Sequence, residues 1–439
     1  MPENSNVVLP ERGRPWNELR AELEALQASD GDWRGGRLPA FVFHLDEATD
    51  HAVREAYAMY FSENGLGMRV FPGLARLESE VIGMGLALFN APPGAAGSFT
   101  SGGTESLFLA VKTARDWFRA ERGGTRRPNT RRPNTERPNT ERLNTGRLNI
   151  VLPYSAHLAL DKAAHYLDLE VRRVPLAAGF RADVAAMEAA MDSSTCLIVG
   201  SAPGYTHGCF DPIAELATLA QGRGVWLHVD ACFGGLSAPF ARDLGEPIPP
   251  FDFALPGVFS LSADLHKYGY AAKGASLFLL RDEALKAHQR FSSSNWPHGT
   301  YATDTFAGSR PAGAIAAAWT ALNSLGWEGY RVAVRNVLDE KNRLIAGIEA
   351  IPGLNVVRPS ESTVLLYTSA PPAPDIDVIA KSLTRRGWVI GRAKEPRGIH
   401  IALNGVHVGI SARYLADLAA SVSEAGETAA QLSGEARYN

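Results

Sequence analysis

Apolar and polar positions follow two alternating periods through the middle of the chain. Short apolar runs typical of strands occur at 149–153, 170–175, 196–200 and 225–230, and stretches with apolar residues every three or four positions separate them. Strands that alternate with helices of about ten residues predict βαβ units and a parallel sheet. The runs lack a clean apolar–polar alternation, which is typical of a sheet covered on both faces.

Two further strand-like runs, at 259–262 and 276–280, enclose a polar turn. The turn carries its polar and aromatic side chains among Ala and Gly: Asp264, His266, Lys267, Tyr268, Tyr270 and Lys273. An ammonium is costly to bury without a partner, and a desolvated lysine loses its proton more easily and becomes a nucleophile. Schiff-base chemistry at Lys267 is therefore the hypothesis for this turn. The alternative is a snorkelling or solvated lysine.

The outer parts of the chain have different patterns. Residues 1–60 indicate an arm followed by helices, and the chain after Pro311 indicates a second group of helices and strands that ends in a helix at 411–425. We therefore predict an N-terminal arm with helices at 1–60, a large domain at 61–310 and a small C-terminal α/β domain at 311–439.

A five-residue repeat interrupts the pattern at 126–150, with the successive units RRPNT, RRPNT, ERPNT, ERLNT and GRLNI. Repeated proline blocks a helix, and so polar a composition favours a disordered surface loop. The alternative is a basic loop with a function of its own.

Composition narrows the class of protein. The 439 residues are 45% hydrophobic and 21% charged, with a net charge of −3, which is ordinary for a globular protein and gives no general basic field for nucleic acid. The three cysteines fit no zinc site, so we expect no metal, and their small odd number favours a reducing compartment. No apolar run approaches the ~18 residues of a membrane span, and the N-terminus has no signal pattern, so we expect a cytoplasmic protein.

A candidate phosphate site precedes one predicted helix. The segment TSGGTES at 100–106 contains Gly102, Gly103 and Thr104 just where the helix begins. Consecutive glycines free the backbone N–H groups, and the helix N-terminus adds partial positive charge, which together suit a phosphate. The alternative is an ordinary turn, and the segment lacks the GK[ST] of a Walker loop.

Two polar residues follow strands of the predicted parallel sheet. Asp230 ends the run at 225–230, and His157 comes shortly after the run at 149–153. Carboxyl ends of such strands bind ligands in open α/β sheets, although a capping aspartate and a structural histidine are the alternatives. With the glycine segment and Lys267, they form the set that pyridoxal phosphate requires: a phosphate cradle, a carboxylate for the pyridine nitrogen, a ring to stack on it and an amine for the aldehyde.

Longer segments carry a family resemblance over roughly residues 33–403. FPGLARLESEV, FTSGGTES, THGCFDP, HVDACFGG and SLSADLHKYGYAAKGAS resemble sphingosine-1-phosphate lyases, a branch of the pyridoxal-phosphate-dependent decarboxylase-like enzymes. The resemblance implies an α/β protein of fold type I, in which a large domain has a mostly parallel seven-stranded sheet and is followed by a small C-terminal domain. It also implies a homodimer whose active site lies at the subunit interface.

The resemblance implies roles for individual residues as well. Lys267 matches the Schiff-base lysine, Asp230 the partner of the pyridine nitrogen and His157 the ring that stacks on the cofactor. Residues expected near the cofactor phosphate are Gly103, Thr104 and His266, and those expected to reach the phosphate of the partner subunit are Gly299 and Thr300. One departure is the segment NGLGMRVFPGL at 64–74, where the family has a sequence close to NPLHPDxFPGL.

These observations predict a lyase that splits a phosphorylated long-chain amino alcohol into a fatty aldehyde and phosphoethanolamine by a retro-aldol step. Lys273 is the candidate cation for the substrate phosphate, and Tyr270 and His157 are candidates for proton transfer. The alternatives are an amino-acid decarboxylase on the same scaffold and a non-catalytic pyridoxal phosphate-binding protein.

Overall fold

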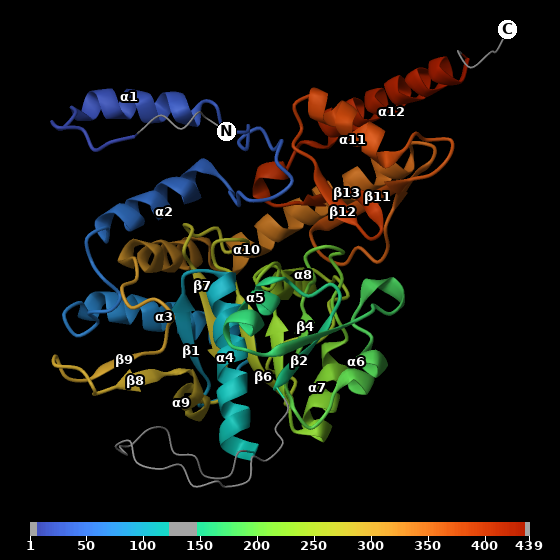
Figure 1. Ribbon diagram of the computed structural model, residues 1–439. Helices are drawn as coiled ribbons and strands as arrows, with labels where there is room; N and C mark the ends of the chain where they lie inside the picture. The colour runs from blue at the N-terminus through green and yellow to red at the C-terminus, as the bar shows by residue number, and fades with distance from the viewer. Residues whose placement is uncertain (1–6, 123–146, 435–439) are drawn as a thin grey trace.

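The computed structural model describes residues 7–122 and 147–434, and it has a large α/β domain with a smaller C-terminal domain (Figure 1). The α-helices are α1 (Trp16–Gln27), α2 (Glu47–Met59), α3 (Pro72–Leu88), α4 (Gly103–Arg122), α5 (Ala159–Tyr166), α6 (Val184–Ala190), α7 (Ile213–Arg223), α8 (Ala238–Asp243), α9 (Lys286–Gln289), α10 (Ala312–Glu349), α11 (Ile376–Arg385) and α12 (Ser411–Gly434). The strands are β1 (Ala96–Thr100), β2 (Asn149–Pro153), β3 (Glu170–Val174), β4 (Thr195–Ser201), β5 (Trp226–Asp230), β6 (Val258–Ala263), β7 (Ser276–Leu280), β8 (Phe291–Ser293), β9 (Tyr301–Thr303), β10 (Leu354–Val356), β11 (Val364–Ser369), β12 (Gly391–Lys394) and β13 (Arg397–Ala402).

The large domain is built on a seven-stranded sheet in the order β1-β7-β6-β5-β4-β2-β3. Strand β7 is antiparallel to both of its neighbours, and the other pairs are parallel. Apolar side chains of α4 and α5 pack on one face of the sheet, and those of α3, α7 and α10 pack on the other. The predicted fold class, with its mostly parallel seven-stranded sheet and smaller C-terminal domain, is confirmed.

Strand β1 is the member of this sheet that the apolar pattern did not predict. Its sequence, AGSFT, has few β-formers, yet it pairs along its whole length with β7. A Cβ on Gly97 would lie 2.6 Å from Leu279 Cδ2 and 2.8 Å from Ile82 Cγ2. The glycine therefore lets α3 pack closely on the sheet. Because glycine has no apolar side chain, it interrupts the apolar run that would otherwise predict a strand here.

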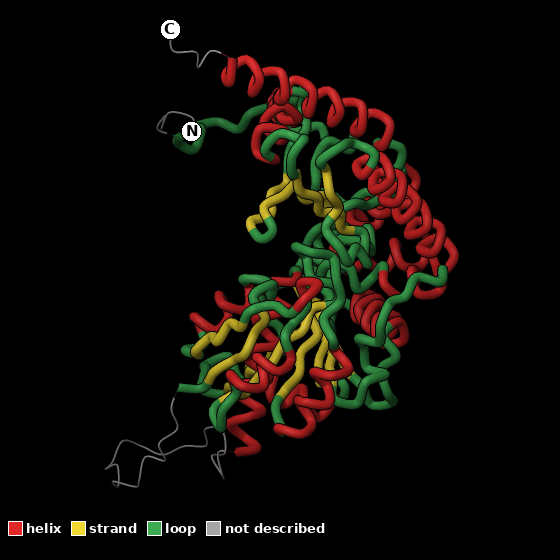
Figure 2. Tube along the Cα trace, turned by 90° about the vertical axis from the view of Figure 1, so that its right-hand side faces the viewer, coloured by secondary structure: helices red, strands yellow, loops and turns green. Residues whose placement is uncertain are grey.

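The small domain has a four-stranded antiparallel sheet in the order β10-β11-β13-β12, with α11, α12 and the second half of α10 around it. The short apolar run at 388–391 also suits a strand, but β12 begins only at Gly391, and Trp388 is instead buried beside Tyr414. The first half of α10 packs against α2 and α3, so this long helix joins the two parts of the molecule. Figure 2 shows these two parts one above the other, each with its own strands. The predicted domain boundary near Pro311 directly precedes α10 and stays a prediction.

Two further sequence predictions concern the five-residue repeat and the absence of a membrane span. The repeat lies outside the described residues except for its last positions, where Asn149 and Ile150 begin β2. In the part of the chain that the structure describes, no helix is both long and apolar enough to cross a membrane.

Candidate active site

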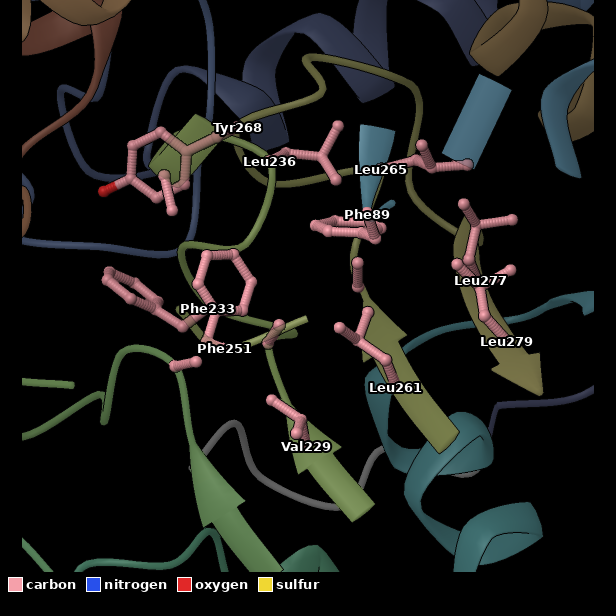
Figure 3. Packing of buried hydrophobic residues seen from close by; sticks show 14 of the residues in the cluster. Phe89, Val229, Phe233, Leu236, Phe251, Leu261, Leu265, Tyr268, Leu277 and Leu279 are labelled. Atoms are coloured by element: carbon pink, nitrogen blue, oxygen red, sulfur yellow. The ribbon is translucent and has the colours of Figure 1, made fainter. Parts of the chain in front are cut away.

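The central strands of the large sheet end side by side. Ser201 on β4, Asp230 on β5 and Ser262 on β6 lie in register, and Val229 and Leu261 pair one position earlier beneath them (Figure 3). Asp230 is buried, and its Oδ1 accepts a hydrogen bond of 3.1 Å from the Cys232 backbone N–H. This holds a carboxylate at the carboxyl edge of the sheet, where open α/β sheets bind ligands.

Lys267 lies in the turn that follows β6. Its Nζ is 2.9 Å from Oδ2 of the buried Asp264 and 5.8 Å from the centre of the Phe233 ring. Burial is the largest influence on the pKa of Lys267 and acts to lower it. The charge and hydrogen bond of Asp264, together with smaller contributions from Cys232 and Asp230, outweigh burial and raise the pKa above its ordinary value. In this state the amine is a charged partner of Asp264.

The glycine segment meets this turn, although it lies far away in the sequence. Gly102 has a φ of +148°, which favours glycine, and Gly103 begins α4. A Cβ on Gly103 would lie 2.9 Å from Asp264 Oδ2 and 3.0 Å from Cys232 Sγ, and one on Gly102 would lie 3.4 Å from His266 Cε1. The N-terminus of α4 thus faces the Lys267 turn, and no residue larger than glycine fits at position 103. Thr104, in the first turn of the helix, is exposed.

His266 and Lys273 complete this side of the site. Burial lowers the pKa of His266, so the imidazole is neutral near pH 7. Lys273 Nζ donates a hydrogen bond of 3.0 Å to the His266 carbonyl and lies 5.3 Å from the Phe43 ring centre. Although part of its side chain is exposed, surrounding protein atoms and then the charge of Lys267 lower the pKa of Lys273 to about 8.

His157 lies on the exposed loop between β2 and α5. Its Nδ1 accepts a hydrogen bond of 3.1 Å from the Ala159 backbone N–H at the start of the helix. This bond orients the ring and makes Nδ1 the acceptor, so that Nε2 carries the proton in the neutral form.

No side-chain contact joins Tyr270, Gly299, Thr300 or His157 to Lys267 in the described chain, although the Tyr270 backbone N–H donates a hydrogen bond of 3.0 Å to the Lys267 carbonyl. Tyr270 is buried with a φ of +54°, and its ring stacks on that of Tyr330 with centroids 6.5 Å apart. This burial argues against the proton-transfer role expected for Tyr270. Gly299 and Thr300 are exposed between β8 and β9, in a hairpin that Figure 1 shows at the margin of the large domain.

Tyr205 is a residue of the site that the sequence patterns missed. It lies in the loop after β4, packs edge-on against Phe233 at 5.1 Å and approaches His400 of the small domain at 4.8 Å. Burial raises the pKa of its phenol, while the charge of Lys267 acts to lower it. Its position directly before the THGCFDP segment, just past a strand end, was the available signal.

Arg310 is an alternative cation near the altered 64–71 segment. Its guanidinium binds both carboxylate oxygens of Glu78, at 2.5 and 3.1 Å, and the carbonyls of Phe99 and Gly65. Since these partners occupy its donors, Arg310 fixes the segment and has little capacity left for a substrate.

Comparison with known proteins agrees with this geometry. Residues 42–366 match the model of the pyridoxal-dependent decarboxylase conserved domain. The chain belongs to this decarboxylase family. It is 38% identical to a sphingosine-1-phosphate lyase of Oryza sativa subsp. japonica over 95% of this chain and 75% of that protein.

Solved structures of the pyridoxal-dependent decarboxylase family share the fold. A sphingosine-1-phosphate lyase of Burkholderia pseudomallei superposes with a TM-score of 0.87 at 34% identity, covering 98% of this chain and 95% of that one. A glutamate decarboxylase of Lactobacillus brevis gives a TM-score of 0.80 at 19% identity, with 96% and 95% covered, which is a likeness of fold alone.

Pyridoxal phosphate is thus the cofactor, and the chain is a pyridoxal-phosphate-dependent lyase. The residues present fit the group. Gly103 leaves a space that any Cβ would fill, the N–H groups at the start of α4 are placed for a phosphate, and Lys267 and Asp230 supply an amine and a carboxylate on neighbouring strand ends.

Proposed function

We propose that the protein cleaves phosphorylated long-chain amino alcohols between C2 and C3, giving a fatty aldehyde and phosphoethanolamine. The observation that carries the proposal is the convergence of Lys267, Asp230 and the Gly103 segment at one edge of the sheet, beside a second lysine, Lys273. Similarity to sphingosine-1-phosphate lyases along nearly the whole chain supports this choice of substrate.

Each residue has a distinct task in the proposed reaction. The bound cofactor supplies a sink for the electron pair that remains when the C2–C3 bond breaks. Lys267 would hold the cofactor through its amine and give way to the substrate amine, and Asp230 would keep a proton on the pyridine nitrogen. His157 would contact the ring, and Gly102, Gly103, Thr104 and His266 would bind the phosphate. Proton transfer at the C3 hydroxyl falls to His157 or Tyr205, because Tyr270 is buried against Tyr330.

The substrate chain needs a passage, and the candidate is an open cavity of about 700 Å³ that is lined by apolar side chains and by the charged Arg173, Lys394 and Glu395. Its lining includes Val174, Leu176 and Phe180 of the large domain and Pro396 of the small domain. Phe180 stacks on His207 at 4.5 Å, and His207 contacts the Glu395 carbonyl at 2.7 Å through Nε2. His207 lies two positions after Tyr205 in the same loop, so the cavity borders the loop that enters the site, and we assign the alkyl chain to this cavity.

The protein is proposed to act as a homodimer with a shared active site. Exposed apolar side chains at the end of α2 and in the following segment include Met59, Phe61 and Val70, and Phe306 follows the β8–β9 hairpin. Figure 1 places α2, α3 and this hairpin on the same side of the molecule. An apolar surface of this kind marks a protein interface, across which Gly299 and Thr300 would reach the phosphate of the partner's cofactor.

A cytoplasmic location is also proposed. The three cysteines, Cys196, Cys209 and Cys232, are free and buried in the structure. Thiols that stay reduced are typical of a reducing compartment.

Product analysis tests the proposed function. Incubation of the loaded protein with a phosphorylated long-chain base should give equal amounts of long-chain aldehyde and phosphoethanolamine. Release of CO₂ from amino acids with no aldehyde would favour the decarboxylase alternative, and no turnover of either class would favour a binding protein.

Substitution of Lys273 tests recognition of the substrate phosphate. Lys273→Ala should lower the preference for phosphorylated over unphosphorylated long-chain bases by about 10- to 100-fold, because one charged hydrogen bond contributes ~1.5–3 kcal/mol. The preference is the ratio of the two kcat/KM values. The absorbance of the bound cofactor should remain, since Lys273 does not carry it.

The same preference should depend on pH. With a pKa of about 8, Lys273 is charged below that pH and neutral above it, so the kcat/KM ratio should be high at pH 7 and fall above pH 8. Lys381→Ala removes an exposed lysine of α11 and should leave the ratio unchanged. An unchanged kcat/KM ratio in Lys273→Ala would show that Lys273 does not bind the substrate phosphate and has a structural role.

A further inference from the structure

The second carboxylate of the site, Asp264, has no role in the scheme above. Its side chain is 3% exposed, and its Oδ2 lies 2.9 Å from Lys267 Nζ and 3.6 Å from His266 Nε2. Its Oδ1 is fully buried and has no hydrogen-bond partner among the described residues. A buried carboxylate with a free oxygen is costly unless a cation neutralises it, so Asp264 depends on the charge of Lys267.

A second buried aspartate shows what a purely structural carboxylate looks like here. Asp211 accepts backbone hydrogen bonds of 2.7 Å from both Ala182 and Ser201, one on each oxygen, and thereby fixes the loop after β4. The Asp264 carboxylate accepts no backbone N–H within the described chain. Its position next to Gly103 is instead set by close packing, since a Cβ there would lie 3.0 Å or less from both carboxylate oxygens.

Among the groups around Lys267, Asp264 is its direct counter-ion. His266 is neutral, Lys273 repels the ammonium, and Asp230 is directed to the Cys232 backbone N–H. The titratable groups that face Lys267 are Asp264, Asp230, Cys232, His266, Lys273 and Tyr205. Within the described residues, Asp264 makes the ion pair with Nζ.

We propose that Asp264 is a positioning residue that receives Lys267 as an ammonium each time the substrate amine displaces it. This inference rests on the proposed function. The exchange requires the incoming substrate ammonium to lose one proton before it attacks, and the departing lysine amine to gain one, so the proton count is balanced. An ammonium bound to Asp264 is no nucleophile, and the released lysine therefore does not compete with the substrate.

The first test needs no substrate and no cofactor. In unloaded wild-type protein, the pH dependence of acetylation by acetic anhydride should give Lys267 a higher pKa than the exposed Lys381, read by peptide mass spectrometry. In Asp264→Asn, the midpoint for Lys267 should fall by about 1–3 pH units, the range for loss of an adjacent opposite charge. A wild-type value at or below that of Lys381 overturns the proposal without any variant.

The second test uses loaded protein and phosphoethanolamine, an amine that has no C2–C3 bond to the long chain and cannot be cleaved. Borohydride fixes whichever amine holds the cofactor at that moment, so the fraction of Lys267 displaced can be measured by peptide mapping. Asp264→Asn should need at least about 10-fold more phosphoethanolamine for half displacement, as expected for a shift of one pH unit or more in the lysine.

Asp183→Asn is the matched control, because it makes the same exchange of a carboxylate for an amide at a residue that caps α6 through the Ala186 backbone N–H and does not act on Lys267. Both readouts should stay at their wild-type values in this variant. A pure packing role for Asp264 would change the melting temperature and leave the Lys267 titration and the displacement curve unmoved, which overturns the proposal. If the proposed function itself is wrong, the product assay will give no aldehyde, and this result is independent of the two tests of Asp264.

Discussion

Lys267→Ala should abolish turnover, with a loss in kcat on the order of 10⁴- to 10⁶-fold, the scale seen when an enzyme loses its covalent group. The side chain supplies an amine 2.9 Å from Asp264, which packs against Gly103, and alanine offers no nitrogen to the cofactor aldehyde. The variant should also release the cofactor on dialysis, because the phosphate contacts alone would have to retain it. The loss of visible absorbance measures this release.

Borohydride reduction of the wild-type protein identifies the lysine directly. Peptide mapping should find the reduced pyridoxyl group on Lys267, and Lys267→Arg should give none, although arginine preserves a positive charge beside Asp264. A pyridoxyl label on Lys273 or another lysine would refute the assignment, as would activity in Lys267→Ala within tenfold of wild type.

Asp230→Asn should keep the cofactor bound and lower kcat by about 10²- to 10⁴-fold, the usual cost of removing an acid–base group. Asparagine still accepts the hydrogen bond from the Cys232 backbone N–H, so the loop after β5 should keep its shape. The amide cannot hold the proton on the pyridine nitrogen, and the cofactor therefore becomes a poorer electron sink. Steady-state kinetics and cofactor absorbance measured together separate turnover from binding.

Asp183→Asn is a suitable control for this exchange. Asp183 caps α6 through Ala186 N at the surface of the large domain, and asparagine caps a helix as well as aspartate does. Activity of Asp230→Asn within twofold of wild type would exclude the proposed role, and loss of bound cofactor in this variant would indicate a role in binding instead.

The apolar pattern predicted the parallel core of the sheet because β2, β4 and β5 consist of buried aliphatic runs, whose character is local to the sequence. Lys267 and Asp230 could be selected as well, because Asp230 ends one strand, Lys267 lies in the turn after the neighbouring strand, and parallel strands end at a common edge. The apolar pattern did not predict strand β1, because its Gly97 is required for close packing with α3 and is not a residue typical of strands.

Other features depend on contacts between distant residues. Tyr270 and Tyr268 stand close to Lys267 in the sequence, but a left-handed backbone at Tyr270 turns that side chain into the core beside Tyr330. Tyr205 enters the site because the loop after β4 folds back against Phe233. Pairing of Lys267 with Asp264 could not be read from the spacing, since a separation of three residues in a turn does not determine which side chains meet.

Tyr268 joins the reacting lysine to the far end of the chain. Its hydroxyl binds the Thr363 side chain and, at 2.7 Å, the Leu403 carbonyl, both in the small domain. The peptide unit next to Lys267 is therefore anchored to residues that follow Tyr268 by 95 and 135 positions. A substitution at Thr363 should therefore lower enzymatic activity as an active-site substitution does, although Thr363 does not contact the substrate. Interpretation of natural variants in this chain should follow this tether rather than distance from the cofactor.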